Sequence, residues 1–337
     1  MIHSGRLFSC LLIAFSLPVS LAVSASTNLE IENALDEMLL HHPAEIIGFD
    51  WHDIPAEKAD LHIAKIYHDA GLRPVWVTEG GPGERAIAIY EAIRNAADDG
   101  LEPGDYGLAE IENAWASRKP EDLARLDILI TVGLVEYISD VRHGRVQPVK
   151  ENEAVYYHGS DKKIDSLAIV KEVLAAEDTT KYLAAQLPTH RFYRQTREGL
   201  KRYRELAKTA KPSRIPEGVT IHPGEVDSRL PAIREHLVLT GDLEAGSDST
   251  AYDDTTVDAI KHYQSRHGLT EDGVIGKDTI TELNVPFAYR VRQVEMNLER
   301  LRWTAHELGS KYTVSYTHLT LPTTGSLGWC RGWGVGF

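Results

Sequence analysis

Residues 252–284 read YDDTTVDAIKHYQSRHGLTEDGVIGKDTITELN, a pattern that predicts two short helices joined by a tight turn. Asp254 can cap the first helix, because its carboxylate can accept hydrogen bonds from the unpaired backbone N–H groups of the first turn. Gly268 ends this helix, since glycine readily takes the left-handed conformation that a C-terminal turn needs. Asp272 and Gly273 then form the tight turn, where glycine supplies the positive φ. One face of the first helix carries, at helical spacing, Val257, Ile260, Tyr263 and Gln264.

A third amphipathic helix is predicted upstream, over residues 228–239. Pro231 is compatible with this helix because it falls in the first turn, where its missing N–H would be unpaired in any case. Gly241 closes the helix. Residues 222–284 are therefore expected to fold as a small three-helix unit.

The order of the residues in this unit carries a family resemblance. The unit contains, in sequence, Leu230–Gly241, Tyr252-Asp253, Thr256-x-x-Ala259-Ile260-x-x-Tyr263-Gln264, Gly268-Leu269 and Asp272-Gly273-Val274-Ile275-Gly276-x-x-Thr279-x-x-x-Leu283. This order resembles the peptidoglycan-binding domain of cell-wall enzymes, which implies a peptidoglycan partner held in a shallow groove. We expect the ligand-binding residues to be Tyr252, Tyr263, Gln264 and Asp272. Two alternatives stay open: Tyr263 belongs to the core, and Gln264, Asp272 and Gly273 only shape the fold.

The composition is that of an ordinary globular protein, with 42% hydrophobic and 26% charged residues. A length of 337 residues leaves room for two or three domains. The net charge of −14 argues against nucleic acid as a partner, because a phosphate backbone would repel it. The same charge disfavours anionic lipid surfaces. None of the 15 histidines shows strong metal-ligand spacing, so we expect no metal and no cofactor.

The first 25 residues have the layout of a secretory signal peptide. His3 and Arg6 precede an apolar run from Leu7 to Leu21, and small residues follow up to Ala25, after which we expect cleavage. A retained membrane anchor is the alternative, but the run is short and is interrupted by polar residues and a proline. We therefore expect a periplasmic protein with no stable membrane span after removal of the signal.

Residues 27–220 are predicted to be mostly helical, with apolar residues at helical spacing between turn-rich connectors. Their distinctive sequences are, in order, Arg73-Pro74-x-Trp76, Asp99-Gly100-Leu101-x-Pro103-x-Asp105-Tyr106, Leu126-Asp127 to Thr131, and Gly144-Arg145-Val146-x-Pro148. This order resembles the helical scaffold domain that precedes the catalytic domain of large periplasmic L,D-transpeptidases. Taken alone, Trp76 and Trp115 are expected in the core rather than as platforms for sugars. Arg145 is expected in an ordinary salt bridge at a helix end.

Residues 285–314 predict a charged helix, from about residue 288 to residue 303, followed by the start of a strand at 311–314. The helix is expected to bury Val291, Val294, Leu298 and Leu301 and to expose Arg290, Arg292, Glu295, Glu299 and Arg302. The sequence Arg290-x-x-Gln293-Val294-x-x-Asn297-Leu298-Glu299-Arg300-Leu301-Arg302-Trp303 resembles the segment that leads into the L,D-transpeptidase catalytic domain.

The resemblance stops after Val314. Residues 315–337 carry one formal charge, that of Arg331, and show neither a helical nor a strand period, so we expect this tail not to be native sequence. L,D-transpeptidases attack the donor stem peptide with a cysteine thiolate that a histidine activates, within a Ser-His-Gly-Cys-x-Arg motif. Cys330 is followed directly by Arg331 and lacks the preceding histidine, so we expect no catalytic residue in the chain as written.

The chain is therefore predicted to be mainly α, with a helical scaffold domain, a small three-helix peptidoglycan-binding domain, and a missing β-rich catalytic domain. The helix at 288–303 favours a truncated, inactive member of the L,D-transpeptidase family, whose full-length relative would cross-link stem peptides. The alternatives are a non-catalytic peptidoglycan-binding protein and a scaffold that recruits other wall enzymes.

Overall fold

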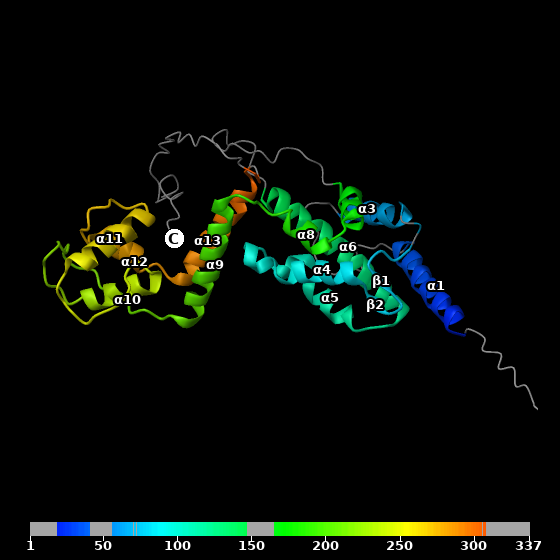
Figure 1. Cartoon of the computed structure of the whole chain (residues 1–337), viewed down its shortest axis with the longest axis horizontal. Coiled ribbons are helices and arrows are strands. Elements are labelled where there is room, and N and C mark those ends of the chain that lie inside the picture. Colours follow the sequence, from blue (N-terminus) through cyan, green and yellow to red (C-terminus); the bar gives the residue numbers. More distant parts are fainter. Residues whose placement is uncertain are drawn as a thin grey trace, which may run out of the picture. The chain divides into compact units, whose positions relative to one another are not determined.

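The structure is a computed structural model that is mainly helical, as predicted (Figure 1). It describes residues 19–40, 56–69, 71, 73–146, 165–304 and 306–307. Side chains are described from Asn28 in the first range and from Ile63 in the second. Among the helices described, none combines the length and the apolar composition that a membrane span requires.

The described residues form two compact units, the first of which lies within residues 1–87 and 109–132. Its elements are α1 (Val19–Leu40), α3 (Ala56–Asp69), β1 (Val77–Thr78), β2 (Gly81–Pro82), the start of α4 (Glu84–Arg94), most of α5 (Leu108–Trp115) and the first half of α6 (Pro120–His143). The two short strands pair antiparallel. Ile31 and Leu35 of α1 and Ile63 of α3 are buried and belong to the core.

A buried carboxylate in α6, that of Asp127, fixes the segment that leads into β1. It accepts hydrogen bonds from the backbone N–H groups of residues 75–77 at 2.7–3.0 Å and from the Tyr67 hydroxyl at 2.7 Å. Burial raises the pKa of Asp127, while these four donors act against the rise. Trp76 is buried and donates from its indole nitrogen to the Thr131 hydroxyl, which confirms that this tryptophan is a core residue.

The second unit lies within residues 88–108 and 133–337 and holds the remainder of α4 and α6. Its other elements are η1 (Ala96–Asp99), η2 (Pro103–Tyr106), α7 (Ser166–Ala175), α8 (Thr179–Ala184), α9 (Arg191–Thr209), α10 (Leu230–Thr240), α11 (Asp254–Arg266), α12 (Lys277–Leu283) and α13 (Phe287–Arg302). Just after α6, Arg145 pairs with Asp105 at 2.7 Å, which confirms the predicted salt bridge at a helix end.

α9 and α13 lie side by side and run antiparallel (Figure 1). The ring of Tyr203, late in α9, lies 6.3 Å from the ring of Phe287 at the start of α13. At the opposite end of the pair, the guanidinium of Arg302 lies 5.9 Å from the ring centre of Tyr193. Leu298 of α13 is fully buried in the core that the two helices share. The chain therefore leaves α9, forms the three-helix unit, and returns alongside α9.

Two arginines of α13 do not lie where the sequence predicts. The expectation that Arg290 and Arg302 face outward is wrong, because both are buried. Arg302 donates to the backbone carbonyl of Asp99 and pairs with Glu299 at 2.9 Å. Arg290 pairs with Glu282 at 2.7 Å. These partners offset part of the cost of burying each arginine, so the buried face of α13 is wider than its apolar stripe indicates.

The three helices predicted within residues 222–284 are α10, α11 and α12, and they surround one hydrophobic core that also contains Ile215 and Ile221. Pro231 lies in the first turn of α10, as predicted. Gly241 and Gly273 have φ values of 78° and 71°, as the predicted helix end and tight turn require. Two isolated β-bridges complete the unit, Ile221 with Ile275 and Val226 with Ala251.

The start of α11 differs from the prediction by one residue. Asp253, not Asp254, is the N-cap, and its Oδ1 accepts a hydrogen bond from the backbone N–H of Thr256 at 2.9 Å. The second oxygen of Asp253 accepts a hydrogen bond from buried Arg234 at 3.1 Å. This tertiary contact selects between two adjacent carboxylates that could each cap the helix.

Several predictions concern residues outside the described part of the chain. They are the signal peptide as far as residue 18, the strand start at 311–314, Cys330, and the tail at 315–337. These stay predictions.

Candidate functional site

The amide side chain of Gln264 holds the tight turn of the three-helix unit. Its Oε1 accepts a hydrogen bond from the Gly273 N–H at 2.9 Å. Its Nε2 donates to the Val274 carbonyl and to Asp272 Oδ1, both at 3.0 Å. Gln264 is only 2% exposed, so its donors and acceptor are directed at the turn and not at solvent.

Tyr252 and Asp272 complete the contacts of the same turn. The Tyr252 hydroxyl donates to the Gly273 carbonyl at 2.7 Å, and burial raises the pKa of this tyrosine. Asp272 Oδ1 accepts a hydrogen bond from the Val274 N–H at 2.9 Å, while the residue itself is exposed. A side chain at Gly273 would strain the backbone at positive φ and would lie 2.9 Å from Val257. Three of the four predicted site residues therefore meet at one rigid turn.

Exposed residues lie on the turn and on the two segments that pair next to Tyr252. The backbone N–H of Tyr252 donates to the Glu225 carbonyl at 2.8 Å, so the segment around Val226 lies against the segment that carries Tyr252. Val226 is 74% exposed, although it is apolar. We use the name turn surface for the exposed residues Val226, Ala251, Glu271 and Asp272. This surface offers apolar and hydrogen-bonding groups on a backbone that Tyr252 and Gln264 hold fixed.

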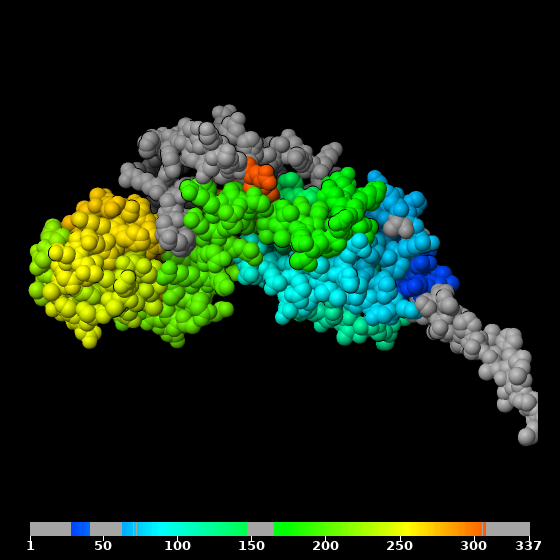
Figure 2. Space-filling model, viewed as in Figure 1, coloured from blue at the N-terminus to red at the C-terminus, as the bar shows by residue number. Residues whose placement is uncertain are grey.

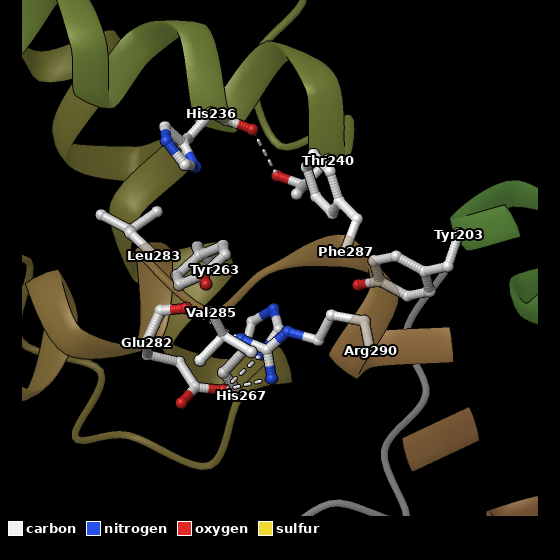
Figure 3. Close-up of a pocket in the computed structure, with 10 residues that line it drawn as sticks. All are labelled: Tyr203, His236, Thr240, Tyr263, His267, Glu282, Leu283, Val285, Phe287 and Arg290. Atoms are coloured by element: carbon white, nitrogen blue, oxygen red, sulfur yellow. Dashed lines mark hydrogen bonds and ion pairs between the residues drawn. The ribbon is translucent and has the colours of Figure 1, made fainter. Parts of the chain in front are cut away.

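The fourth predicted residue, Tyr263, lies apart from this turn and lines a small pocket (Figure 3). Its ring stacks on the imidazole of His267, with ring centres 4.1 Å apart, and it is 2% exposed. The pocket is lined by Tyr203, His236, Thr240, Tyr263, His267, Glu282, Leu283, Val285, Phe287 and Arg290. The contacts of Tyr263 are therefore those of a core residue. This agrees with the alternative, left open by the sequence, that Tyr263 belongs to the core.

A charged cluster lies at one side of this pocket (Figure 3). The Glu282 carboxylate accepts hydrogen bonds from His267 Nδ1 at 3.1 Å and pairs with Arg290 Nη1 at 2.7 Å. Burial acts to raise the pKa of Glu282, but the His267 hydrogen bond and the Arg290 charge outweigh it and hold that pKa below its usual value. Burial lowers the pKa of His267, so its imidazole is neutral at pH 7.

This cluster connects the three-helix unit to α13. Arg290 also donates to the backbone carbonyl of Glu282 at 2.8 Å, so one guanidinium holds both the end of α12 and the start of α13. The charges of Glu282 and Arg290 are paired with each other, so the cluster joins α12 to α13. The sequence did not reveal this group, because its members have no fixed spacing: His267 caps α11, Glu282 lies in α12 and Arg290 lies in α13.

Two family models match the chain. Residues 62–200 match the model described as "Scaffold domain". Residues 228–283 match the model described as "Putative peptidoglycan binding domain", and this match covers α10, α11, α12 and the rigid turn. The chain carries a scaffold domain and a peptidoglycan-binding domain. A search of curated proteins found no match.

The peptidoglycan-binding domain contains all four of the predicted site residues. Of these, only Asp272 presents an exposed side chain. Tyr252 and Gln264 shape the turn, and Tyr263 packs in the core. Direct contact of these side chains with a wall polymer stays a prediction.

Proposed function

We propose that this chain is a periplasmic cell-wall protein of the L,D-transpeptidase family that binds peptidoglycan through residues 222–284. The observation that carries the proposal is the match of residues 228–283 to a peptidoglycan-binding domain, in a segment whose core and turn are fully formed. The scaffold match at 62–200 supports the relation to L,D-transpeptidases, because the sequence resembles their domain order.

The turn surface is the part of the domain that we propose to contact the polymer. Asp272 accepts hydrogen bonds from hydroxyl or amide groups of the polymer, and Val226 packs against a sugar face. Tyr252 and Gln264 act indirectly, since they hold the turn in one conformation before the ligand arrives. A site that is rigid in advance loses less conformational freedom on binding.

In this proposal the described residues supply wall binding and not the chemical step. They include no cysteine, whereas the family's reaction needs a cysteine thiolate to form the thioester with the donor stem peptide. The full-length relative would add a reaction domain after α13, which the resemblance of residues 290–303 supports.

Incubation of the full chain with purified sacculi tests the proposal. We expect the chain to sediment with the sacculi and to leave their cross-links unchanged by muropeptide analysis. A chain from which residues 222–284 are replaced by a short flexible linker should remain in the supernatant. If the full chain itself remains in the supernatant at every salt concentration, the proposed function is wrong.

A further inference from the structure

Charge is distributed unevenly along the second unit. Residues 191–214 contain nine basic and two acidic residues, a net charge of +7, in a chain whose net charge is −14. The peptidoglycan-binding domain at 222–284 contains 13 acidic and five basic residues, a net charge of −8. A strongly basic segment therefore directly precedes a strongly acidic domain.

The basic residues of this segment lie mainly on the outer side of α9. The inner side of the helix buries Tyr193, Leu200 and Tyr203. Side chains of α9 reach the molecular surface in the lime-green part of Figure 2. We use the name basic face for the exposed residues Arg191, Arg194, Lys201, Arg202, Lys208, Lys211 and Arg214.

Most of the basic face is free of carboxylate partners in the described part of the chain. Arg197 and Arg204, which do not belong to it, pair with Asp99 and Glu295. Arg202 donates to the Leu239 carbonyl of α10 at 3.2 Å, so the peptidoglycan-binding domain contacts α9 within the basic face. Lys201, Lys208, Lys211 and Arg214 form no ion pair with any described carboxylate. Four unpaired cations on a short stretch attract an external anion.

We propose that the basic face binds the carboxylates of peptidoglycan stem peptides, while the acidic domain binds the same polymer through its uncharged groups. The proposal rests on the proposed function. An acidic domain alone would be repelled by the carboxylates of the polymer, and the neighbouring cations offset that repulsion. Because the domain that binds the polymer also contacts α9 through Arg202, the second contact forms at a high effective concentration.

An anionic lipid surface is a poorer fit to the same cations. Helices that bind in the lipid interface insert an apolar face. The apolar side of α9 is occupied by α13, and none of the large exposed hydrophobic side chains of the described residues lies on α9. A lipid plane would also lie close to the acidic domain that α9 contacts and would repel it.

The test compares two triple charge reversals in the full chain. One carries Lys201→Glu, Lys208→Glu and Lys211→Glu on the basic face. The control carries Lys65→Glu, Lys119→Glu and Arg125→Glu, three exposed positions of the first unit that change the net charge equally. We expect the first variant to bind sacculi about tenfold more weakly at low salt, and the control to bind as the wild type does. Retention of the wild type should decrease as the salt concentration rises. At low salt, it should be weaker on sacculi whose carboxylates have been amidated than on untreated sacculi.

Five outcomes would overturn the inference. If wild-type retention on sacculi is unchanged by salt and by amidation, the proposed carboxylate contact is wrong and the proposed function stands. The same conclusion follows if both variants are retained equally. Two further outcomes also remove the carboxylate contact, if the basic-face variant still binds sacculi as the wild type does. In one, only that variant loses binding to anionic phospholipid vesicles; in the other, only that variant loses a concentration-dependent dimer seen in sedimentation. Absence of wild-type retention at any salt concentration defeats both this inference and the proposed function.

Discussion

The guanidinium of Arg302 donates to the backbone carbonyl of Asp99, a residue 203 positions earlier in the chain. Asp99 lies within the scaffold match at 62–200, whereas Arg302 follows the peptidoglycan-binding match at 228–283. The helix that carries Arg302 also packs along α9, whose first half belongs to the scaffold match. In its packing, α13 is therefore part of the scaffold, and the peptidoglycan-binding domain is inserted between two of its helices.

Replacement of Arg302 by alanine is expected to destabilise the second unit by about 3–5 kcal/mol, because it leaves the carboxylate of Glu299 and the carbonyl of Asp99 without their buried partner. Urea denaturation followed by circular dichroism measures the change. Arg292→Ala, at an exposed position of the same helix, is the control and should change stability little. Equal stability of the two variants would contradict the structural role given to Arg302.

Gln264→Leu is expected to loosen the tight turn. The substitution leaves the buried N–H of Gly273 without an acceptor, which costs about 2 kcal/mol and corresponds to about 30-fold faster hydrogen exchange at that amide. Sacculus binding should weaken as well, although Gln264 does not reach the surface. Gln195→Leu, at an exposed position of α9, is the control and should leave the exchange of Gly273 unchanged.

Two substitutions of Asp272 separate the role of its negative charge from the role of its hydrogen-bonding oxygen. Asp272→Asn keeps an oxygen that can accept the hydrogen bonds from Val274 and Gln264, so we expect nearly normal binding to sacculi. Asp272→Ala removes this oxygen and should weaken binding about fivefold or more. Sedimentation with sacculi measures both, and alanine binding as well as wild type would exclude Asp272 from the site.

Acidification is expected to destabilise the peptidoglycan-binding domain. The folded pKa of His267 lies below its usual 6.5, so the stability that the neutral imidazole provides is present above pH 6.5 and is lost as the pH falls through the folded pKa. The folded pKa of Glu282 lies below its usual 4.5, so its contribution is lost at still lower pH, in the same direction.

His267→Gln isolates the first of these two effects, since glutamine cannot gain a proton but can donate to Glu282. We expect the unfolding temperature of the wild type to fall more steeply than that of this variant between pH 7 and pH 5. Parallel curves over this range would show that His267 does not titrate with folding.

Local features of the peptidoglycan-binding domain are those that the sequence predicts best. Pro231, Gly241 and Gly273 act through their own backbone preferences, which are the same in any fold, and the structure places them as expected. The cap of α11 is predicted to within one residue, because the choice between Asp253 and Asp254 depends on Arg234, which belongs to another helix.

Features that depend on distant partners could not be predicted. Arg290 and Arg302 have the polarity of surface residues, and their burial follows from contacts with Glu282 and with the carbonyl of Asp99. Periodicity predicts which side chains are apolar, but it does not show which charged side chains find a buried partner. The turn surface was missed for a related reason: the segment of Val226 pairs with that of Ala251, and the Tyr252 side chain connects the latter to the turn at Gly273 only in the folded chain.

The insertion of the peptidoglycan-binding domain between α9 and α13 also determines how mechanical force on the domain would be transmitted to the rest of the unit. Both covalent connections of the domain join the same end of this antiparallel pair, so tension from a stretched wall divides between two tethers. It draws the two helices in one direction and does not slide them past each other. The interface between α9 and α13 would then experience little shear, and the strain would pass to the scaffold at the opposite end, where Arg302 is anchored.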